Sequence, residues 1–160
     1  MNLLELFAPI RTFIFDVDGV LTDGSLHITN EGLQLRTLHA RDKYAMQQAV
    51  KKGYKVWIHT TERTEAMRLY VDQLGLREVY LEDIKAATHA AHNTILYMGD
   101  DIPDLTAMQL CGLPCCPNDA VSEVRQYVKY ISPQNGGKGC VRDVIEKVLK
   151  LNGDWDIPTA

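Results

Sequence analysis

Two aspartates, Asp16 and Asp18, come directly after a run of apolar residues in the segment FIFDVDGVLTDG, residues 13–24. Side chains two apart in an extended chain point to the same side, so both carboxylates can face one small volume. Carboxylates held this close repel each other unless a cation neutralises them or one is protonated. A hard divalent ion suits such a pair, and Mg²⁺ in particular binds through few carboxylates together with a substrate phosphate.

Further acidic and polar side chains follow later apolar runs. Asp100 and Asp101 come soon after the run ILYM, Asp104 comes three residues later, and Thr60 follows KVWI. Ligands bind beyond the carboxyl ends of parallel strands, so these side chains are expected at one edge of a sheet. A single aspartate after a strand is usually a turn or helix-cap residue. The repetition of the pattern in several strands is what favours a functional site.

Apolar runs and helical periodicities alternate along the chain, which predicts parallel βαβ units and a doubly wound α/β sheet. Residues 24–39 interrupt the alternation, and the turn signal Asn30-Glu31-Gly32 predicts a β-hairpin flap there. Residues 1–151 are expected to form one domain, with no large cap, and residues 152–160 a polar tail. The expected strands are 12–15, 55–58, 78–81, 94–98, 112–116 and 128–131, and the expected helices are 42–52, 63–74, 84–92, 103–111 and 122–127.

The composition is that of an ordinary globular domain, with 46% hydrophobic and 24% charged residues in 160. The net charge of -4 argues against a nucleic-acid partner, which would favour a basic face. The four cysteines lack the spacing of a zinc site. With no secretory signal and no apolar stretch near about 18 residues, we expect a cytoplasmic protein that does not bind membranes.

The order of these motifs resembles that of the haloacid dehalogenase superfamily of phosphotransferases. The matching elements are DVDGVLTDG, Thr60 after the second long strand, Lys85, and GDDIPD at residues 99–104. The resemblance covers nearly the whole chain. The small flap, the length and the glycine-rich stretch 136–139 are further similar to phosphatases of 3-deoxy-D-manno-octulosonate 8-phosphate (KDO 8-phosphate), a substrate of lipopolysaccharide synthesis.

This resemblance implies a role for each catalytic position. Asp16 would be the nucleophile that forms an aspartyl phosphate, and Asp18 the acid that protonates the leaving oxygen and then activates water. Mg²⁺ would be held by the carboxylates of Asp16 and Asp100 and by the main-chain oxygen of Asp18. Thr60 would donate a hydrogen bond to the phosphate, and Lys85 would neutralise its charge.

The resemblance also implies a substrate site and an assembly. Arg41 and Asp42, which follow the flap, and Lys138 from the glycine-rich stretch are candidate contacts for the sugar acid. The expected assembly is a homotetramer in which each flap covers a neighbouring site. Glu62 is a further candidate substrate contact, and it stands where the family's usual turn, Thr-Gly-Arg, carries an arginine. Residues 60–65, Thr-Thr-Glu-Arg-Thr-Glu, resemble more closely the turn of phosphatases of the nine-carbon 2-keto-3-deoxynononate 9-phosphate.

The segment between Lys85 and Gly99 is shorter than in the family by about two helical turns.

Two other classes of protein share parts of this pattern. A signalling receiver domain would share the doubly wound sheet and an acidic pocket, but it would require adjacent acids after the first strand. A non-catalytic assembly module would retain the site without using it. Mg²⁺-dependent turnover of an aryl phosphate distinguishes the phosphatase from both.

Overall fold

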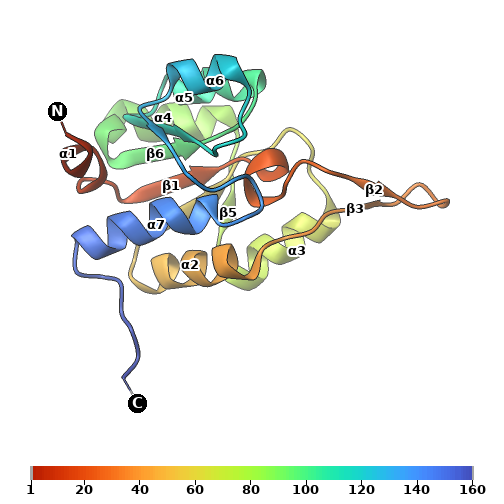
Figure 1. The fold of residues 1–160 in the computed structure, drawn as a ribbon, viewed down its shortest axis with the longest axis horizontal. Coiled ribbons are helices and arrows are strands. Elements are labelled where there is room, and N and C mark those ends of the chain that lie inside the picture. Colours follow the sequence, from red (N-terminus) through yellow and green to blue (C-terminus); the bar gives the residue numbers. More distant parts are fainter. Residues whose placement is uncertain (1, 160) are drawn as a thin grey trace.

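The computed structural model describes residues 2–159 and has a six-stranded parallel sheet in the order β5-β4-β1-β6-β7-β8 (Figure 1). A separate two-stranded antiparallel hairpin, β2-β3, follows β1. The predicted α/β class and the small flap are therefore confirmed. The strands are β1 (Thr12–Phe15), β2 (His27–Ile28), β3 (Gln34–Leu35), β4 (Lys55–Ile58), β5 (Arg77–Glu78), β6 (Ile95–Met98), β7 (Leu113–Cys116) and β8 (Tyr130–Ile131).

Helices cover both faces of the sheet, with α2, α3 and α7 on one side and α4, α5 and α6 on the other (Figure 1). This arrangement buries the strands on two faces, as their continuous apolar runs require. The helices are α1 (Leu3–Phe7), α2 (Ala40–Lys51), α3 (Glu65–Leu74), α4 (Leu81–Ala91), α5 (Leu105–Met108), α6 (Ser122–Tyr127) and α7 (Cys140–Leu151), with short 3-10 turns at His92–Thr94 and Ile102–Asp104.

Strand β1 lies at the centre of the sheet, between β4 and β6. Phe13 and Phe15 pack into the core beneath α2 and α7, whereas Ile14 packs into the opposite core. All three side chains are fully buried. The end of β1 is consequently held by both layers, which gives Asp16 a rigid base.

The structure differs from the prediction around residue 80. The third strand was expected to continue to residue 81, but β5 ends at Glu78 and α4 begins at Leu81. Tyr80 is the residue before the helix, and its N–H donates to the Asp83 carboxylate at 2.8 Å. This capping contact starts the helix early, because it satisfies a donor that the first turn leaves free.

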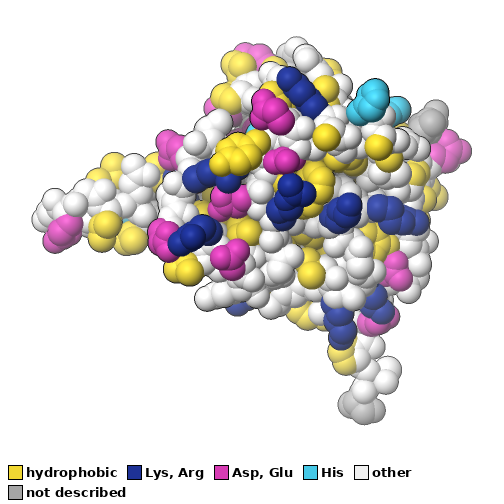
Figure 2. Space-filling view, turned by 180° about the vertical axis from the view of Figure 1, so that it is seen from behind, with side chains coloured by type: hydrophobic (Ala, Val, Ile, Leu, Met, Phe, Trp, Pro, Cys, Tyr) yellow, Lys and Arg dark blue, Asp and Glu magenta, His cyan; other side chains and the backbone are white. Residues whose placement is uncertain are grey.

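The hairpin projects from the body of the molecule and carries exposed apolar side chains (Figure 2). These are Leu26, Ile28, Leu33 and Leu35. Within residues 2–159, no helix combines the length and the apolar character needed to cross a membrane.

Candidate active site

A cavity of about 310 Å³ opens at the carboxyl end of the parallel strands. It contains the motif residues that follow β1, β4 and β6, which the sequence predicted to share this edge. Its position agrees with the general location of ligand sites in doubly wound sheets. The lining residues are Asp16, Asp18, Gly24, His59, Thr60, Thr61, Glu62, Asp100, Asp101, Pro103 and Asp104.

The turn after β1 brings Asp16 into this cavity. The Asp16 N–H donates to the Met98 oxygen at 3.1 Å, and its Oδ1 accepts from the Val17 N–H at 2.8 Å. Gly19 follows with φ +91°, and a Cβ built on it would lie 1.8 Å from Oδ2 of Asp100. Only glycine permits this approach, so the first motif loop can contact the carboxylate after β6.

Three carboxylates gather at one side of the cavity. Asp16, Asp100 and Asp104 each place one oxygen within 4.8 Å of the others. Burial and the neighbouring carboxylates raise the pKa of Asp16 to about 9, and burial followed by the charge of Asp104 raises that of Asp100 to about 7. A positive charge bound between acidic groups this close would offset their mutual repulsion. A hard, oxygen-preferring divalent cation fits this donor set, which forms a divalent metal site.

Asp104 has partners of its own on both carboxylate oxygens. Oδ1 accepts from the Tyr97 hydroxyl at 3.0 Å, and Oδ2 accepts from the N–H groups of Asp100 and Asp101 at 2.9 and 3.2 Å. The Tyr97 hydroxyl also lies 2.7 Å from Nδ1 of His59. Asp104 thus orients the loop that presents Asp100, and a buried tyrosine orients Asp104 in turn.

Asp18 lies on another side of the cavity and is held by the hairpin. Nε of Arg36 donates to its Oδ1 at 2.8 Å, and Nη2 donates to its Oδ2 at 3.1 Å. The hydroxyl of Thr22 donates to Oδ1 at 3.3 Å. Nη2 of Arg36 also reaches Oε2 of Glu62 at 3.1 Å. The two carboxylates are therefore joined by one guanidinium across the opening.

The turn after β4 supplies the remaining polar wall. Oγ1 of Thr60 accepts from the Glu62 N–H at 3.2 Å, which closes the turn. Both residues line the cavity, as does Thr61 between them. Thr60 is thus within the site where the sequence predicted it.

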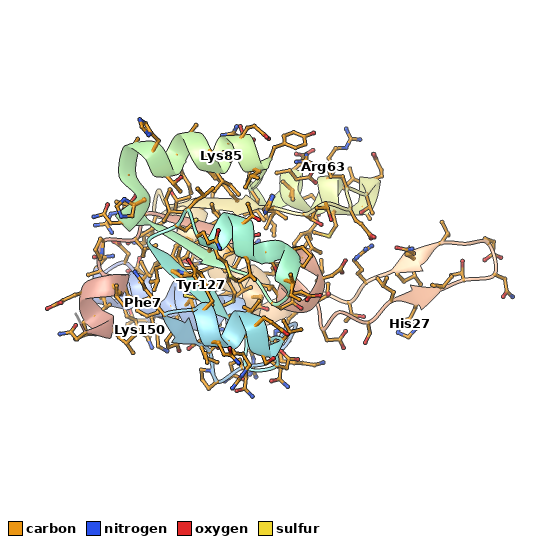
Figure 3. The ribbon with its side chains drawn as sticks, turned by 90° about the horizontal axis from the view of Figure 1, so that it is seen from above. Phe7, His27, Arg63, Lys85, Tyr127 and Lys150 are labelled. Carbon is orange, nitrogen blue, oxygen red and sulfur yellow. The ribbon has the colours of Figure 1, made fainter. Side chains whose placement is uncertain are left out.

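Four predicted site residues do not line this cavity. Lys85 is exposed on α4 (Figure 3). Arg41 and Lys138 line a different cavity of about 470 Å³, next to the start of α7. Asp42 is 1% exposed, and its Oδ1 accepts from the Arg142 N–H at 2.9 Å, which ties α2 to α7. The catalytic role assigned to Lys85 and the substrate contacts assigned to Arg41, Asp42 and Lys138 remain predictions.

The glycine-rich stretch packs against the first motif loop. A Cβ on Gly136 would lie 1.9 Å from the Gly19 oxygen, and one on Gly137 would lie 2.5 Å from the Asp23 nitrogen. The Gly137 N–H donates to the Val20 oxygen at 2.9 Å. The glycines permit this backbone contact, a structural purpose that the sequence pattern did not reveal.

Three residues that shape the site were not singled out from the sequence: Arg36, His59 and Tyr97. Arg36 was one of several basic residues near the flap, and nothing in its spacing related it to Asp18. His59 and Tyr97 are close in sequence to the motif residues Thr60 and Gly99, so the sequence did indicate that they lie near the site. Their contact depends on the pairing of both strands with β1.

Comparison with known proteins identifies the relatives of the chain. No protein-family model matches it. The KDO 8-phosphate phosphatase KdsC of Escherichia coli K12 is 30% identical over 156 residues, which cover 92% of this chain and 83% of the relative. A structure from Legionella pneumophila, assigned to the HAD superfamily, subfamily III A, superposes with a TM-score of 0.88 at 31% identity, covering 94% of this chain and 88% of the other.

A third relative was solved with ligands. The KDO 8-phosphate phosphatase of Moraxella catarrhalis, in complex with magnesium, phosphate and KDO, superposes with a TM-score of 0.84 at 25% identity, covering 92% of this chain and 90% of the other. The fold and the acidic site therefore define a HAD-type phosphatase. Within that superfamily the chain belongs to subfamily III A and is similar to KdsC, the KDO 8-phosphate phosphatase.

Proposed function

We propose that this protein is a Mg²⁺-dependent phosphatase that hydrolyses a 2-keto-3-deoxy sugar acid phosphate, with KDO 8-phosphate as the first candidate. The observation that supports the proposal most is the grouping of Asp16, Asp100 and Asp104 in one cavity with Asp18. The similarity to KdsC over most of the chain supports the same substrate class. With that substrate, the protein would act in the cytoplasm in lipopolysaccharide synthesis.

Asp16, Asp18 and Thr60 each have a defined task in this reaction. A carboxylate oxygen of Asp16 attacks phosphorus, and the bond to the sugar oxygen breaks as Asp18 gives it a proton. Asp18 then takes a proton from the water that hydrolyses the aspartyl phosphate. Thr60 donates to the phosphoryl oxygens. Bound Mg²⁺ supplies charge neutralisation for the acidic cluster and the phosphate.

The nine-carbon 2-keto-3-deoxynononate 9-phosphate is the second candidate substrate. The turn that contains Glu62 favours it, because residues 60–65 resemble the turn of phosphatases of that ester more closely. Glu62 lies at the opening of the cavity and is 64% exposed. A carboxylate at that position repels the acid group of a substrate that comes close to it, and accepts hydrogen bonds from hydroxyls. The length of the sugar would therefore decide which group meets Glu62.

We also propose a homotetramer in which the hairpins cover neighbouring sites. Strands β2 and β3 have two residues each, and a lone two-stranded hairpin is marginally stable in water. Its exposed leucines and isoleucine gain stability if a second copy covers them. Sedimentation equilibrium tests this, and a monomer at all concentrations would contradict it.

The test of function is phosphate release from a panel of eight- and nine-carbon 2-keto sugar acid phosphates, with and without Mg²⁺. We expect turnover that needs the metal, a higher kcat/KM for the panel than for p-nitrophenyl phosphate, and no turnover by Asp16→Asn. Turnover that survives Asp16→Asn or chelation would contradict the proposed chemistry. If kcat/KM for every substrate of the panel is no higher than that for p-nitrophenyl phosphate, the proposed substrate class is contradicted.

A further inference from the structure

The cavity is rich in carboxylates and poor in cations. None of its lining residues, within the part of the chain that the structure describes, is a lysine or an arginine. Lys85, the expected phosphate-neutralising residue, is exposed on α4 (Figure 3). Among residues 2–159, Arg36 is the basic residue that forms ion pairs with the cavity's acids. The six acidic lining residues are Asp16, Asp18, Glu62, Asp100, Asp101 and Asp104.

Arg36 is held much more firmly than a surface arginine. Its side chain is only 8% exposed, although it belongs to the projecting hairpin segment. Its Nε and Nη2 form two parallel bonds to the oxygens of Asp18, the fork geometry that fixes a carboxylate in both position and rotation. A lysine would supply the charge without fixing the rotation.

Nη2 is shared between two acceptors at the same distance. It lies 3.1 Å from Oδ2 of Asp18 and 3.1 Å from Oε2 of Glu62. Nη2 therefore links Asp18 to a second carboxylate, while Nε makes a separate bond to Oδ1 of Asp18. These three contacts hold both the guanidinium and the Asp18 carboxylate in place.

The chain that follows Arg36 is anchored to the body of the domain. The hairpin strand β3 ends at Leu35, and Leu38 packs against the core cluster under α2. His39 accepts the Arg41 N–H on its Nδ1 at 3.2 Å and so begins α2. Arg36 is thus at the base of the hairpin, where the hairpin joins the body of the domain.

We propose that Arg36 is a positioning residue that orients the Asp18 carboxylate toward the leaving-group oxygen. Through Arg36, the base of the hairpin helps to position the catalytic acid. This rests on the proposed function, in which Asp18 is the general acid. As the bond from Asp16 to phosphorus forms and the bond to the leaving oxygen breaks, that oxygen takes the proton of Asp18. Misdirection of Asp18 then matters most when the leaving group is poor.

The experiment compares kcat/KM for two esters that differ in their leaving group, because kcat/KM reports the step in which the leaving group departs and not the later hydrolysis that both esters share. Phenyl phosphate releases the poorer leaving group and depends on the acid, whereas p-nitrophenyl phosphate depends on it little. For Arg36→Met we expect kcat/KM for phenyl phosphate to fall about 10- to 100-fold and kcat/KM for p-nitrophenyl phosphate to fall by less than about 5-fold. Arg68→Met, which removes an exposed arginine paired with Glu65 on α3, should change neither.

Arg36→Lys keeps the charge without the fork and covers the case in which Arg36→Met does not fold. We expect it to show the same selective loss for phenyl phosphate, at about 3- to 30-fold. An equal loss on both esters, or no loss on either, would overturn the proposal while the phosphatase function stands. A wild-type protein that hydrolyses neither ester nor any sugar acid phosphate with Mg²⁺ would overturn both.

Discussion

Replacement of Gly19 by alanine should damage the metal site through a single methyl group. The added Cβ would lie 1.8 Å from Oδ2 and 2.3 Å from Cγ of Asp100, whereas real Cβ contacts are essentially never below 3.0 Å. Either the Asp100 carboxylate or the loop after β1 must therefore move by about 1 Å. Both carry groups of the acidic cluster.

The expected loss follows from that displacement. A shift of about 1 Å in a catalytic group costs about 100-fold in rate, and disturbance of the residues around a metal costs about 10- to 100-fold in affinity. We therefore expect kcat/KM to fall about 100-fold and the Mg²⁺ concentration for half activity to rise about 10-fold or more. Backbone strain at φ +91° adds about 1–3 kcal/mol of destabilisation.

The assay is phosphate release over a Mg²⁺ titration, with thermal unfolding measured in parallel. Gly53→Ala is the matched control, because Gly53 has φ +89° but no atom within 4 Å of its added Cβ. It should lose a similar amount of stability and keep its activity and Mg²⁺ requirement. If Gly19→Ala behaves like Gly53→Ala in the activity assay, the close approach to Asp100 has no part in metal binding.

Three further outcomes are expected. In the folded protein the pKa of Asp16 is about 9 and that of Asp100 is about 7, whereas both carboxyl groups lose their protons near pH 4 in the unfolded chain. The folded state therefore binds more protons between these values, and the metal-free protein should become less stable from about pH 4 to about pH 9. Mg²⁺ should then raise the Tm more at about pH 8 than at about pH 5, and a pH-independent shift would contradict this. Tyr97→Phe removes the hydroxyl bonded to Asp104 and should lower the free energy of unfolding by about 1–3 kcal/mol and the Mg²⁺ affinity about 10-fold. Denaturant unfolding and Mg²⁺ titration measure these two quantities, and Tyr127→Phe, at an exposed position, should change neither. Glu62→Arg should shift the kcat/KM ratio of eight- to nine-carbon substrates towards the eight-carbon ester, and an unchanged ratio would exclude Glu62 from substrate selection.

The sheet and the acidic edge were accessible from the sequence because local patterns determine them. The uninterrupted apolar run before Asp16 predicted a strand with the bounds that β1 has. Asp16, Asp100 and Thr60 follow three such runs, and the parallel arrangement of β1, β4 and β6 brings them together. Local pattern and topology agree here, so the prediction of the cavity did not depend on side-chain detail.

Two elements were missed for different reasons. α7 was not predicted, although Val141, Val144, Ile145 and Val148 have helical spacing and are fully buried. The helical spacing was therefore present in the sequence, and this helix could have been predicted from it. α1 has five residues, too few for a periodicity to be visible.

The contacts that Arg36 makes with Asp18 and Glu62 could not be predicted from the spacing of these residues in the sequence. Arg36 and Asp18 are 18 residues apart, and Arg36 and Glu62 are 26 apart. Their meeting depends on the direction in which the hairpin leaves β1 and returns to α2. The flap was predicted, but not the orientation of its base, so this arginine had no distinguishing feature among the basic residues of the chain.

In the proposed reaction Asp16 attacks phosphorus beside a metal held with Asp100. A crystal structure with Mg²⁺ and beryllium fluoride, which mimics a phosphoryl group on a carboxylate, tests this most directly. We predict beryllium bonded to an Asp16 oxygen, with Mg²⁺ in contact with the carboxylates of Asp16 and Asp100. Beryllium bonded to another residue, or Mg²⁺ bound away from these two aspartates, would contradict it.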